Sequence, residues 1–160
     1  MVRLGVMKTN AMRILESLGI EYKVHTYEFD EEHLDAVHAA ASAGLDPERV
    51  YKTIVMRNTA REVFVFCLPA EYEISLKKAR ALTSSKEIDL IKQTELMPLT
   101  GYIRGGCSPL GMRKHYPTFI EELSQLEDTI FVSAGQRGMQ LEVAPEDLRR
   151  ATDAVFADFT

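Results

Sequence analysis

The sequence predicts an α+β fold, a single domain with a mixed, largely antiparallel sheet flanked by helices. Helical and strand-like segments are interspersed along the 160 residues without a regular βαβ rhythm, and several strands are joined as hairpins. A chain of this length is expected to bury roughly 70% of the surface that its unfolded form exposes. The composition, 46% hydrophobic and 27% charged residues, is that of an ordinary globular protein.

The first part of the chain predicts two helices separated by a strand. Thr9 or Asn10 caps a helix with an apolar stripe at helical spacing, and Gly19 ends it. Residues 22–29 are rich in aromatic and β-branched side chains and predict a strand. Three acidic residues then open a helix over 30–43, because negative charge in a first turn suits the helix dipole.

The middle of the chain predicts a hairpin. Residues 50–57 and 62–68 form its strands around a turn at 58–60, and the second strand is apolar on both faces, which indicates a central position in its sheet. The remaining expected elements are a turn of helix at Asp46-Pro47, helices over 75–82, 121–126 and 145–151, a short helix before Pro98, and strands over 86–91, 115–120, 129–134, 139–144 and 154–159.

Charge and hydropathy narrow the protein class. Net charge −5 and a pI near 5.4 argue against a free-standing, non-specific nucleic-acid binder. The sequence has neither a signal peptide nor an apolar run of membrane-spanning length, and its two cysteines form no disulfide framework, so a cytoplasmic protein is expected. We interpret residues 1–7 as an N-terminal extension, for which disorder is one expectation and Met7 an alternative start, and residues 8–160 as the domain.

Lys52 is the most informative single residue. It alternates with Val50, Ile54 and Met56 on one face of its predicted strand. A lysine among apolar neighbours either extends its amine to solvent at the strand end or points it into a cavity. In a cavity, the ammonium can polarise a carbonyl or hold an anion.

Two glycine-containing segments are candidate ligand loops. Ser133, Ala134 and Gly135 end a predicted strand, and their N–H groups are suited to an oxyanion, although a tight hairpin also needs small residues. Gly105-Gly106 permits close approach of backbone to a ligand, although ordinary loops use glycine too.

The sequence predicts neither a metal site nor a nucleotide cofactor. His33 and His38 are five residues apart, not the four that would align two ligands on a helix, and a P-loop, a dinucleotide fingerprint and a Gly-x-Ser-x-Gly elbow are all absent. A Cys/His hydrolase, with Cys107 as nucleophile and His115 as base, is a minor alternative.

Four short motifs occur in one order along nearly the whole chain. They are Lys-Thr-Asn-Ala with His-Thr-Tyr at 25–27, Tyr-Lys-Thr at 51–53, Thr-Gly-Tyr at 100–102 running into Gly-Gly-Cys-Ser-Pro-Leu-Gly, and Val-Ser-Ala-Gly-Gln-Arg-Gly at 132–138. Together they resemble the YbaK type of aminoacyl-tRNA deacylase, the Cys-tRNA(Pro) deacylases. These are stand-alone relatives of the editing domain inserted in bacterial prolyl-tRNA synthetases.

The resemblance implies a curved mixed sheet, a catalytic Lys52 and a pocket for the end of an aminoacyl-tRNA. The residues that it implies for substrate binding are Tyr27, Thr53, Gly105, Gly106, Ser133, Ala134 and Gly135. The family does not require cysteine at position 107, which argues against Cys107 as the nucleophile. In this family the substrate's own thiol is thought to attack its ester, releasing tRNA and a thiolactone that water opens.

The resemblance also implies partners and leaves alternatives. It implies tRNA(Pro) as the carrier, and prolyl-tRNA synthetase as a docking partner that supplements weak tRNA affinity. Related domains act on alanine or other small amino acids, so a different aminoacyl specificity is one alternative. A non-catalytic module that binds aminoacylated RNA ends is another.

Overall fold

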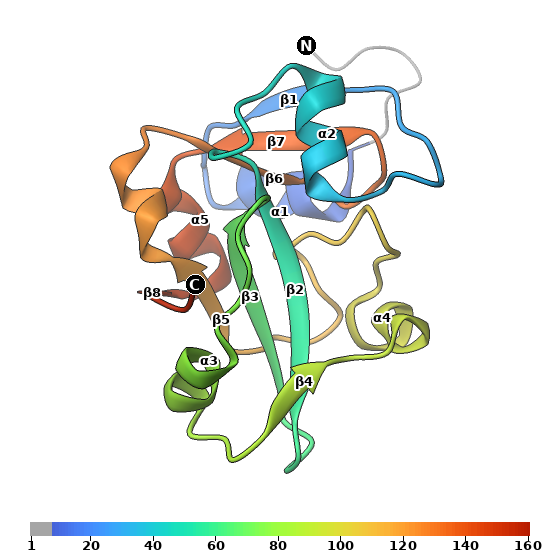
Figure 1. The fold of residues 1–160 in the computed structure, drawn as a ribbon. Helices are drawn as coiled ribbons and strands as arrows, with labels where there is room; N and C mark the ends of the chain where they lie inside the picture. The colour runs from blue at the N-terminus through green and yellow to red at the C-terminus, as the bar shows by residue number, and fades with distance from the viewer. Residues whose placement is uncertain (1–7) are drawn as a thin grey trace.

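The computed structural model describes residues 8–160, and the expected N-terminal extension lies outside the described residues. Its strands form two sheets surrounded by helices (Figure 1). The first sheet has the order β1-β7-β6, and the second has the order β4-β2-β3-β5-β8. Four of the strand pairs are antiparallel and two are parallel, so the α+β class with largely antiparallel pairing is confirmed.

The five-stranded sheet is built on the expected hairpin. Its strands are β2 (Tyr51–Asn58), β3 (Val63–Pro69), β4 (Ile88–Leu90), β5 (Thr118–Glu121) and β8 (Val155–Ala157). The antiparallel β2–β3 pair lies between β4 on one side and the parallel strands β5 and β8 on the other. The apolar β3 is the central strand and is buried over nearly its whole length, as its sequence predicts.

The three-stranded sheet is antiparallel throughout. It consists of β1 (Lys23–Thr26), β6 (Ile130–Ser133) and β7 (Met139–Val143). The turn between β6 and β7 contains Gly135 and Gly138, both at positive φ, which explains the glycine at each end of this turn. The expected strand over 22–29 is shorter, because pairing with β7 stops near Tyr27, whose N–H donates to the Gly138 carbonyl.

The helices are short and locally capped. They are α1 (Asn10–Ser17), α2 (Ala36–Ala43), α3 (Leu76–Thr83), α4 (Gln93–Thr100) and α5 (Pro145–Thr152), with a 3-10 segment η1 over Glu122–Leu126. Side-chain oxygens of Thr9, Asp35 and Ser75 accept N–H groups of the first turns of α1, α2 and α3. Pro145 occupies the first helical position of α5, as predicted.

The second helix begins six residues later than the sequence predicts. The Asp30 carboxylate accepts the Glu32 N–H and contacts His33, which closes a turn in place of a helix. Asp35 is the residue that caps α2, through the His38 N–H at 2.9 Å. Both aspartates are suited to cap a helix, so the local sequence pattern does not distinguish between them.

Two further expectations on helices were wrong. Pro98 lies inside α4 and does not follow it. The helix is short, so the missing proline N–H removes a single intrahelical bond, and the Glu95 side chain holds the first turn by accepting the Lys92 N–H. Asp46-Pro47 forms a turn without a helical segment.

The two sheets share one buried apolar core, and the chain just before β2 also bonds directly to β6. Val50 forms an isolated parallel bridge with Phe131, and the Phe131 N–H donates to the Arg49 carbonyl at 2.9 Å. The Arg49 guanidinium lies 4.9 Å from the centroid of the Phe131 ring and donates to the backbone and hydroxyl of Thr129. These contacts fix the relative position of the two sheets. No helix within residues 8–160 has the length and apolar character that a membrane span requires.

Candidate functional site

A cavity of about 200 Å³ lies where β2 approaches the three-stranded sheet, α2 and the glycine loop. Five of the expected site residues line it: Tyr27, Lys52, Thr53, Gly105 and Ser133. The cavity is not lined by three other expected residues, Gly106, Ala134 and Gly135. These three lie in the adjoining loops, next to residues that do line it. Segments far apart in the sequence therefore converge on one cavity, and sequence spacing alone does not reveal this.

Lys52 reaches this cavity from β2. Its side chain is about half-buried, and Nζ donates to the Ala70 carbonyl at 3.0 Å. Burial lowers the pKa of Lys52, and the nearby carboxylates of Glu73 and Asp35 oppose this shift. Of the two positions considered from the sequence, the structure favours the second, because Lys52 is half-buried and lines a cavity. One carbonyl partner leaves the ammonium with further donors for a ligand.

The turn after β6 does not offer the oxyanion site that its small residues predict. The Ala134 N–H donates to the Met139 carbonyl at 3.0 Å, and the Gly135 N–H donates to Ser133 Oγ at 3.2 Å. These amides therefore satisfy the hairpin itself. The hydrogen bonds favour the other interpretation of this segment, which is a tight hairpin that requires small residues.

The glycine loop packs against the same turn. A Cβ atom on Gly106 would lie 3.0 Å from Gln136 Cα and 3.1 Å from Arg137 N, so two backbones are in direct contact here. Gly105 has a φ of +83° and lines the cavity. The Gly106 N–H donates to the Ile103 carbonyl, whereas within residues 8–160 the neighbouring Gly105 and Cys107 N–H groups have no backbone acceptor.

Cys107 lines the cavity but has the wrong environment for a nucleophile. Burial raises the pKa of its thiol to about 12, so the thiol is protonated at neutral pH. His115, the base considered from the sequence, is exposed and lines a different cavity. None of the residues that line the Lys52 cavity is a histidine. Among the described residues, this cavity therefore lacks the nucleophile and base pair that the Cys/His alternative needs.

Two buried polar atoms at this cavity have no hydrogen-bond partner within the described part of the chain. They are Thr53 Oγ1 and Gln140 Oε1. Gln140 was not among the expected site residues, although the alternation of Met139-Gln140-Leu141 places it on the face opposite its apolar neighbours. Cavity residues from α2 and its preceding segment were also missed, because the sequence placed this helix too early.

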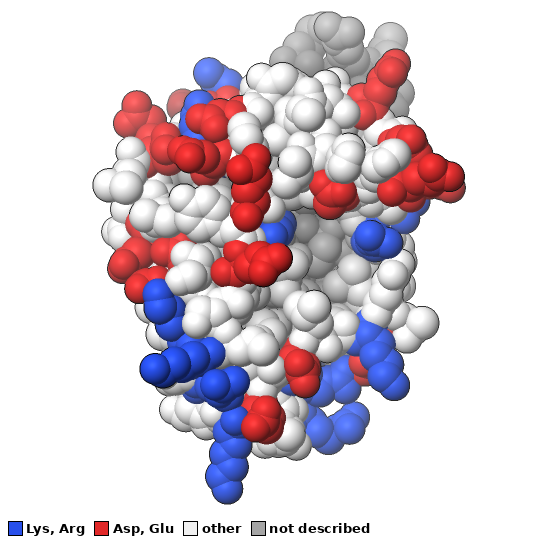
Figure 2. All heavy atoms as spheres, viewed as in Figure 1, with Lys and Arg blue, Asp and Glu red and all other residues white. Residues whose placement is uncertain are grey.

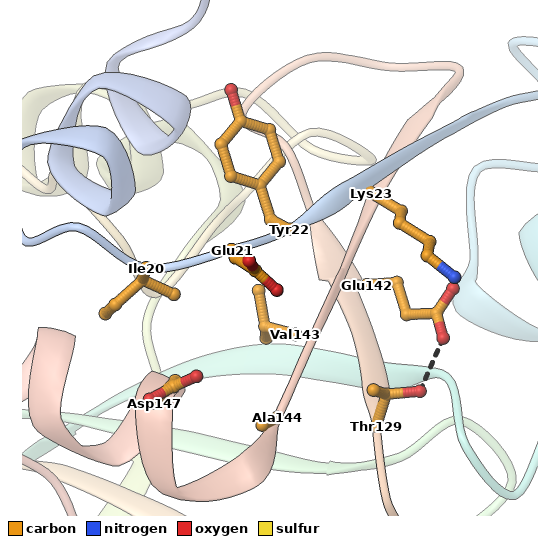
Figure 3. A pocket seen from close by; sticks show the side chains of 9 residues that line it. All are labelled: Ile20, Glu21, Tyr22, Lys23, Thr129, Glu142, Val143, Ala144 and Asp147. Atoms are coloured by element: carbon orange, nitrogen blue, oxygen red, sulfur yellow. Dashed lines mark hydrogen bonds between the residues drawn. The ribbon is translucent and has the colours of Figure 1, made fainter.

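A larger recess of about 520 Å³ lies on another part of the three-stranded sheet (Figure 3). The Thr129 hydroxyl donates to the Glu142 carboxylate, and the Lys23 amine points toward the same carboxylate. His25 Nε2 contacts the other Glu142 oxygen at 2.8 Å. These polar groups are engaged with one another, and none of the expected site residues lines this recess.

His33 and His38 are brought together in spite of their spacing. Their ring centroids are 4.5 Å apart, and their Nδ1 atoms face the carboxylates of Asp30 and Asp35. His33 precedes α2, so a helical spacing rule does not apply to this pair. Across residues 8–160, no group of three histidine, cysteine or acidic side chains is arranged to hold a metal ion.

Comparison with known proteins relates this chain to editing domains. A family model for the aminoacyl-tRNA editing domain matches residues 30–151. EbsC of Enterococcus faecalis, named as a candidate Cys-tRNA(Pro)/Cys-tRNA(Cys) deacylase, is 40% identical over 153 residues, which cover 96% of this chain and 93% of EbsC. The uncharacterized YwhH protein of Bacillus subtilis is 23% identical over 76% of each chain.

Two solved structures share the fold. The hypothetical protein APE2540 has a TM-score of 0.85 at 20% identity, covering 94% of this chain and 99% of its own. A candidate trans-editing enzyme for prolyl-tRNA synthetase has a TM-score of 0.82 at 22% identity, covering 97% of this chain and 99% of its own.

Replacing Gly106 by alanine tests the contact between the two loops. We expect Gly106→Ala to lower the free energy of unfolding by about 1–3 kcal/mol, because the added Cβ overpacks a backbone contact that cannot easily move. Chemical denaturation measures this change. Arg104→Ala, on the exposed surface of the same loop, is the control and should change stability by less than about 0.5 kcal/mol. Equal stability of Gly106→Ala and the parent would contradict the close approach.

Proposed function

This chain belongs to the aminoacyl-tRNA editing domain family, and we propose that it removes cysteine wrongly attached to tRNA(Pro). Membership makes the chain an aminoacyl-tRNA deacylase, a hydrolase that acts on the ester between an amino acid and tRNA. Its similarity to EbsC along 96% of its length supports cysteine as the amino acid. Charging of tRNA occurs in the cytoplasm, where we propose that the protein acts.

The observation that carries this proposal is a half-buried lysine at a small cavity whose described lining residues pair no thiol or hydroxyl with a histidine base. Lys52 supplies positive charge at this cavity. The Cys107 thiol is protonated, and the Ser133 hydroxyl is bound to the hairpin backbone. A site of this composition is suited to a substrate that brings its own reactive group, and cysteine does so.

The proposed reaction begins with the substrate thiol. Its sulfur attacks the carbonyl carbon of the ester, a C–S bond forms, and the bond from this carbon to the 3′ oxygen of tRNA breaks. The thiol proton ends on the departing 3′ oxygen, and the amino acid leaves as a four-membered thiolactone. Water then opens this ring to give cysteine. Because the attack is intramolecular, the protein contributes mainly conformation and charge stabilisation.

The described residues provide groups for both tasks. We assign the Lys52 ammonium to the developing negative charge on the carbonyl oxygen. The Gly105 and Cys107 N–H groups, which lack backbone acceptors within the described chain, are candidate additional donors. Tyr27, Thr53 and Ser133 line the same cavity and are proposed to bind the aminoacyl end. Gly106, Ala134 and Gly135 are proposed to support this wall from behind.

The charge distribution supports assisted delivery of tRNA. Figure 2 shows basic side chains gathered at the end of the molecule that carries α3 and β4, and acidic ones around α2. Beside the cavity, Lys52 and Arg104 are the basic lining residues, and Asp35 lies among them. A net charge of −5 and the presence of only two basic residues among those described as lining the cavity favour weak intrinsic tRNA binding. We propose that prolyl-tRNA synthetase supplements this binding as a docking partner.

Replacing Lys52 by methionine tests its catalytic role. We expect Lys52→Met to lower kcat/KM for cysteinyl-tRNA(Pro) by roughly 10²–10³-fold, the range for a lost oxyanion stabiliser. The thermal midpoint should stay the same or rise, because an apolar chain of similar length replaces a desolvated charge. Lys77→Met, at an exposed position of α3, is the matched control.

The pH dependence of the parent enzyme follows from the same residue. An ammonium acts only below its pKa, and burial lowers the pKa of Lys52. The rate of enzymatic deacylation, after subtraction of uncatalysed hydrolysis, should therefore decline as the pH rises. The decline should begin at a lower pH than it would if Lys52 had the pKa of an ordinary lysine, about 10.4. Full activity of Lys52→Met would refute the role.

A panel of substrates and one variant locate the reacting sulfur. Cysteinyl-tRNA(Pro) should be cleaved at least about tenfold faster than alanyl- or seryl-tRNA(Pro), which have no thiol, because intramolecular attack is lost. Cys107→Ser should keep most of the activity, since its thiol is protonated and remains outside the reaction. Equal rates on the seryl substrate would exclude thiol assistance. An inactive but folded Cys107→Ser would revive the protein nucleophile, and absence of turnover on every substrate would favour the binding-module alternative.

Affinity measurements test the docking proposal. The chain alone should bind tRNA weakly at about physiological salt, with a shallow dependence on salt concentration. Adding prolyl-tRNA synthetase should raise the deacylation rate at low enzyme concentration, and an unrelated synthetase provides the control. Tight tRNA binding by the chain alone, or no stimulation by the synthetase, would contradict the proposal.

A further inference from the structure

Gln140 is a polar residue buried at the cavity with an unsatisfied side chain. It lies on β7, is about 5% exposed, and is paired in register with Ser133 of β6 and His25 of β1. Its Oε1 atom is buried and has no hydrogen-bond partner within residues 8–160. A buried amide without a partner destabilises a fold, so its presence at a ligand cavity indicates a partner supplied by the ligand.

The neighbouring residue on the same face behaves differently. Glu142 is two positions along β7 and is bound by Thr129 and His25. The missing hydrogen-bond partner is therefore specific to Gln140, beside the cavity, and is not shared by the polar side chain two positions along the same strand. The terminal amide of glutamine turns about a soft torsion, so its carbonyl can face the cavity when a donor arrives.

The charges around the cavity define the donor that this amide suits. An aminoacyl ester carries an α-ammonium close to its carbonyl, and Lys52 would repel that ammonium. Lys52 belongs to the five-stranded sheet and Gln140 to the three-stranded sheet, so the two groups approach the cavity from different walls. The acidic lining residue, Asp35, is held by the N–H and the ring of His38. An amide carbonyl remains as a buried acceptor away from Lys52.

We propose that the side-chain carbonyl of Gln140 accepts a hydrogen bond from the α-amino group of the aminoacyl moiety. The inference rests on the proposed function, because it takes an aminoacyl ester as the ligand. The amine is thereby held on a different wall from Lys52, and the ester carbonyl is oriented toward the ammonium. A substrate without a free α-amino group leaves Gln140 unpaired and is bound less well.

A two-by-two comparison isolates this contact. The substrates are cysteinyl-tRNA(Pro) and 3-mercaptopropionyl-tRNA(Pro), which keeps the thiol and the ester and lacks only the amino group. The enzymes are the parent and Gln140→Met, an unbranched side chain of similar length whose thioether is only a weak acceptor. The parent should favour the cysteinyl substrate by roughly ten- to a hundredfold, and Gln140→Met should abolish this preference by slowing cysteinyl-tRNA alone.

Two controls separate recognition from folding. Gln140→Glu retains an acceptor and should retain the preference, and Gln136→Met, at an exposed position in the adjoining turn, should match the parent. Thermal melts of every variant report on folding. The inference is overturned if Gln140→Met keeps the preference, or if it slows both substrates equally.

A binding measurement keeps the inference testable even if cysteinyl-tRNA is not the substrate. Cysteine or alanine joined to 3′-amino-3′-deoxyadenosine by an amide is a stable mimic of the aminoacyl end, and the matching acyl amides lack the amino group. Calorimetry should find tighter binding of the amino-bearing member of at least one pair, and this difference should vanish in Gln140→Met. Equal affinities within both pairs for the parent overturn the role of Gln140, whereas loss of cysteine selectivity alone overturns the proposed substrate.

Discussion

The contact between β2 and β6 is the constraint on which the site depends. Three contacts join the two sheets beside the apolar core that they share. They are the Val50–Phe131 bridge, the hydrogen bond from the Phe131 N–H to the Arg49 carbonyl, and the Arg49 guanidinium over the Phe131 ring. Lys52 follows this junction by two residues on one side, and Ser133 follows it by two on the other. Because strands advance in fixed steps, the junction sets the distance between the two walls of the cavity.

The polar groups of the cavity divide into those that maintain the fold and those left for a ligand. The Ala134 and Gly135 amides close their own turn, and the Asp35 carboxylate caps α2. Lys52 has one carbonyl partner, and Gln140 Oε1 has none within the described chain. Unpaired buried polar groups are unfavourable in an empty fold, so their concentration at one cavity is a physical indication of function that is independent of any sequence motif.

The composition of the cavity bears on how an editing domain distinguishes between amino acids. A protein nucleophile would need a nearby base and would attack any aminoacyl ester of suitable size. This cavity has no histidine, and its cysteine thiol is protonated because it is buried. Chemistry that depends on a group carried by the substrate distinguishes amino acids by reactivity as well as by size. Size alone separates small side chains poorly.

The sequence by itself determined the elements whose signals are local. Gly19 ends a helix, Pro145 begins one, and the apolar β3 is central, because caps, φ preferences and burial periodicity act within a few residues. The motif order also identified the family and five of the residues that line the cavity. Tertiary structure decided between Asp30 and Asp35 as the cap of α2, directed the small residues after β6 into their own turn, and brought Gln140 to the cavity. These outcomes depend on packing between segments distant in the chain, and a local pattern carries no information about such contacts.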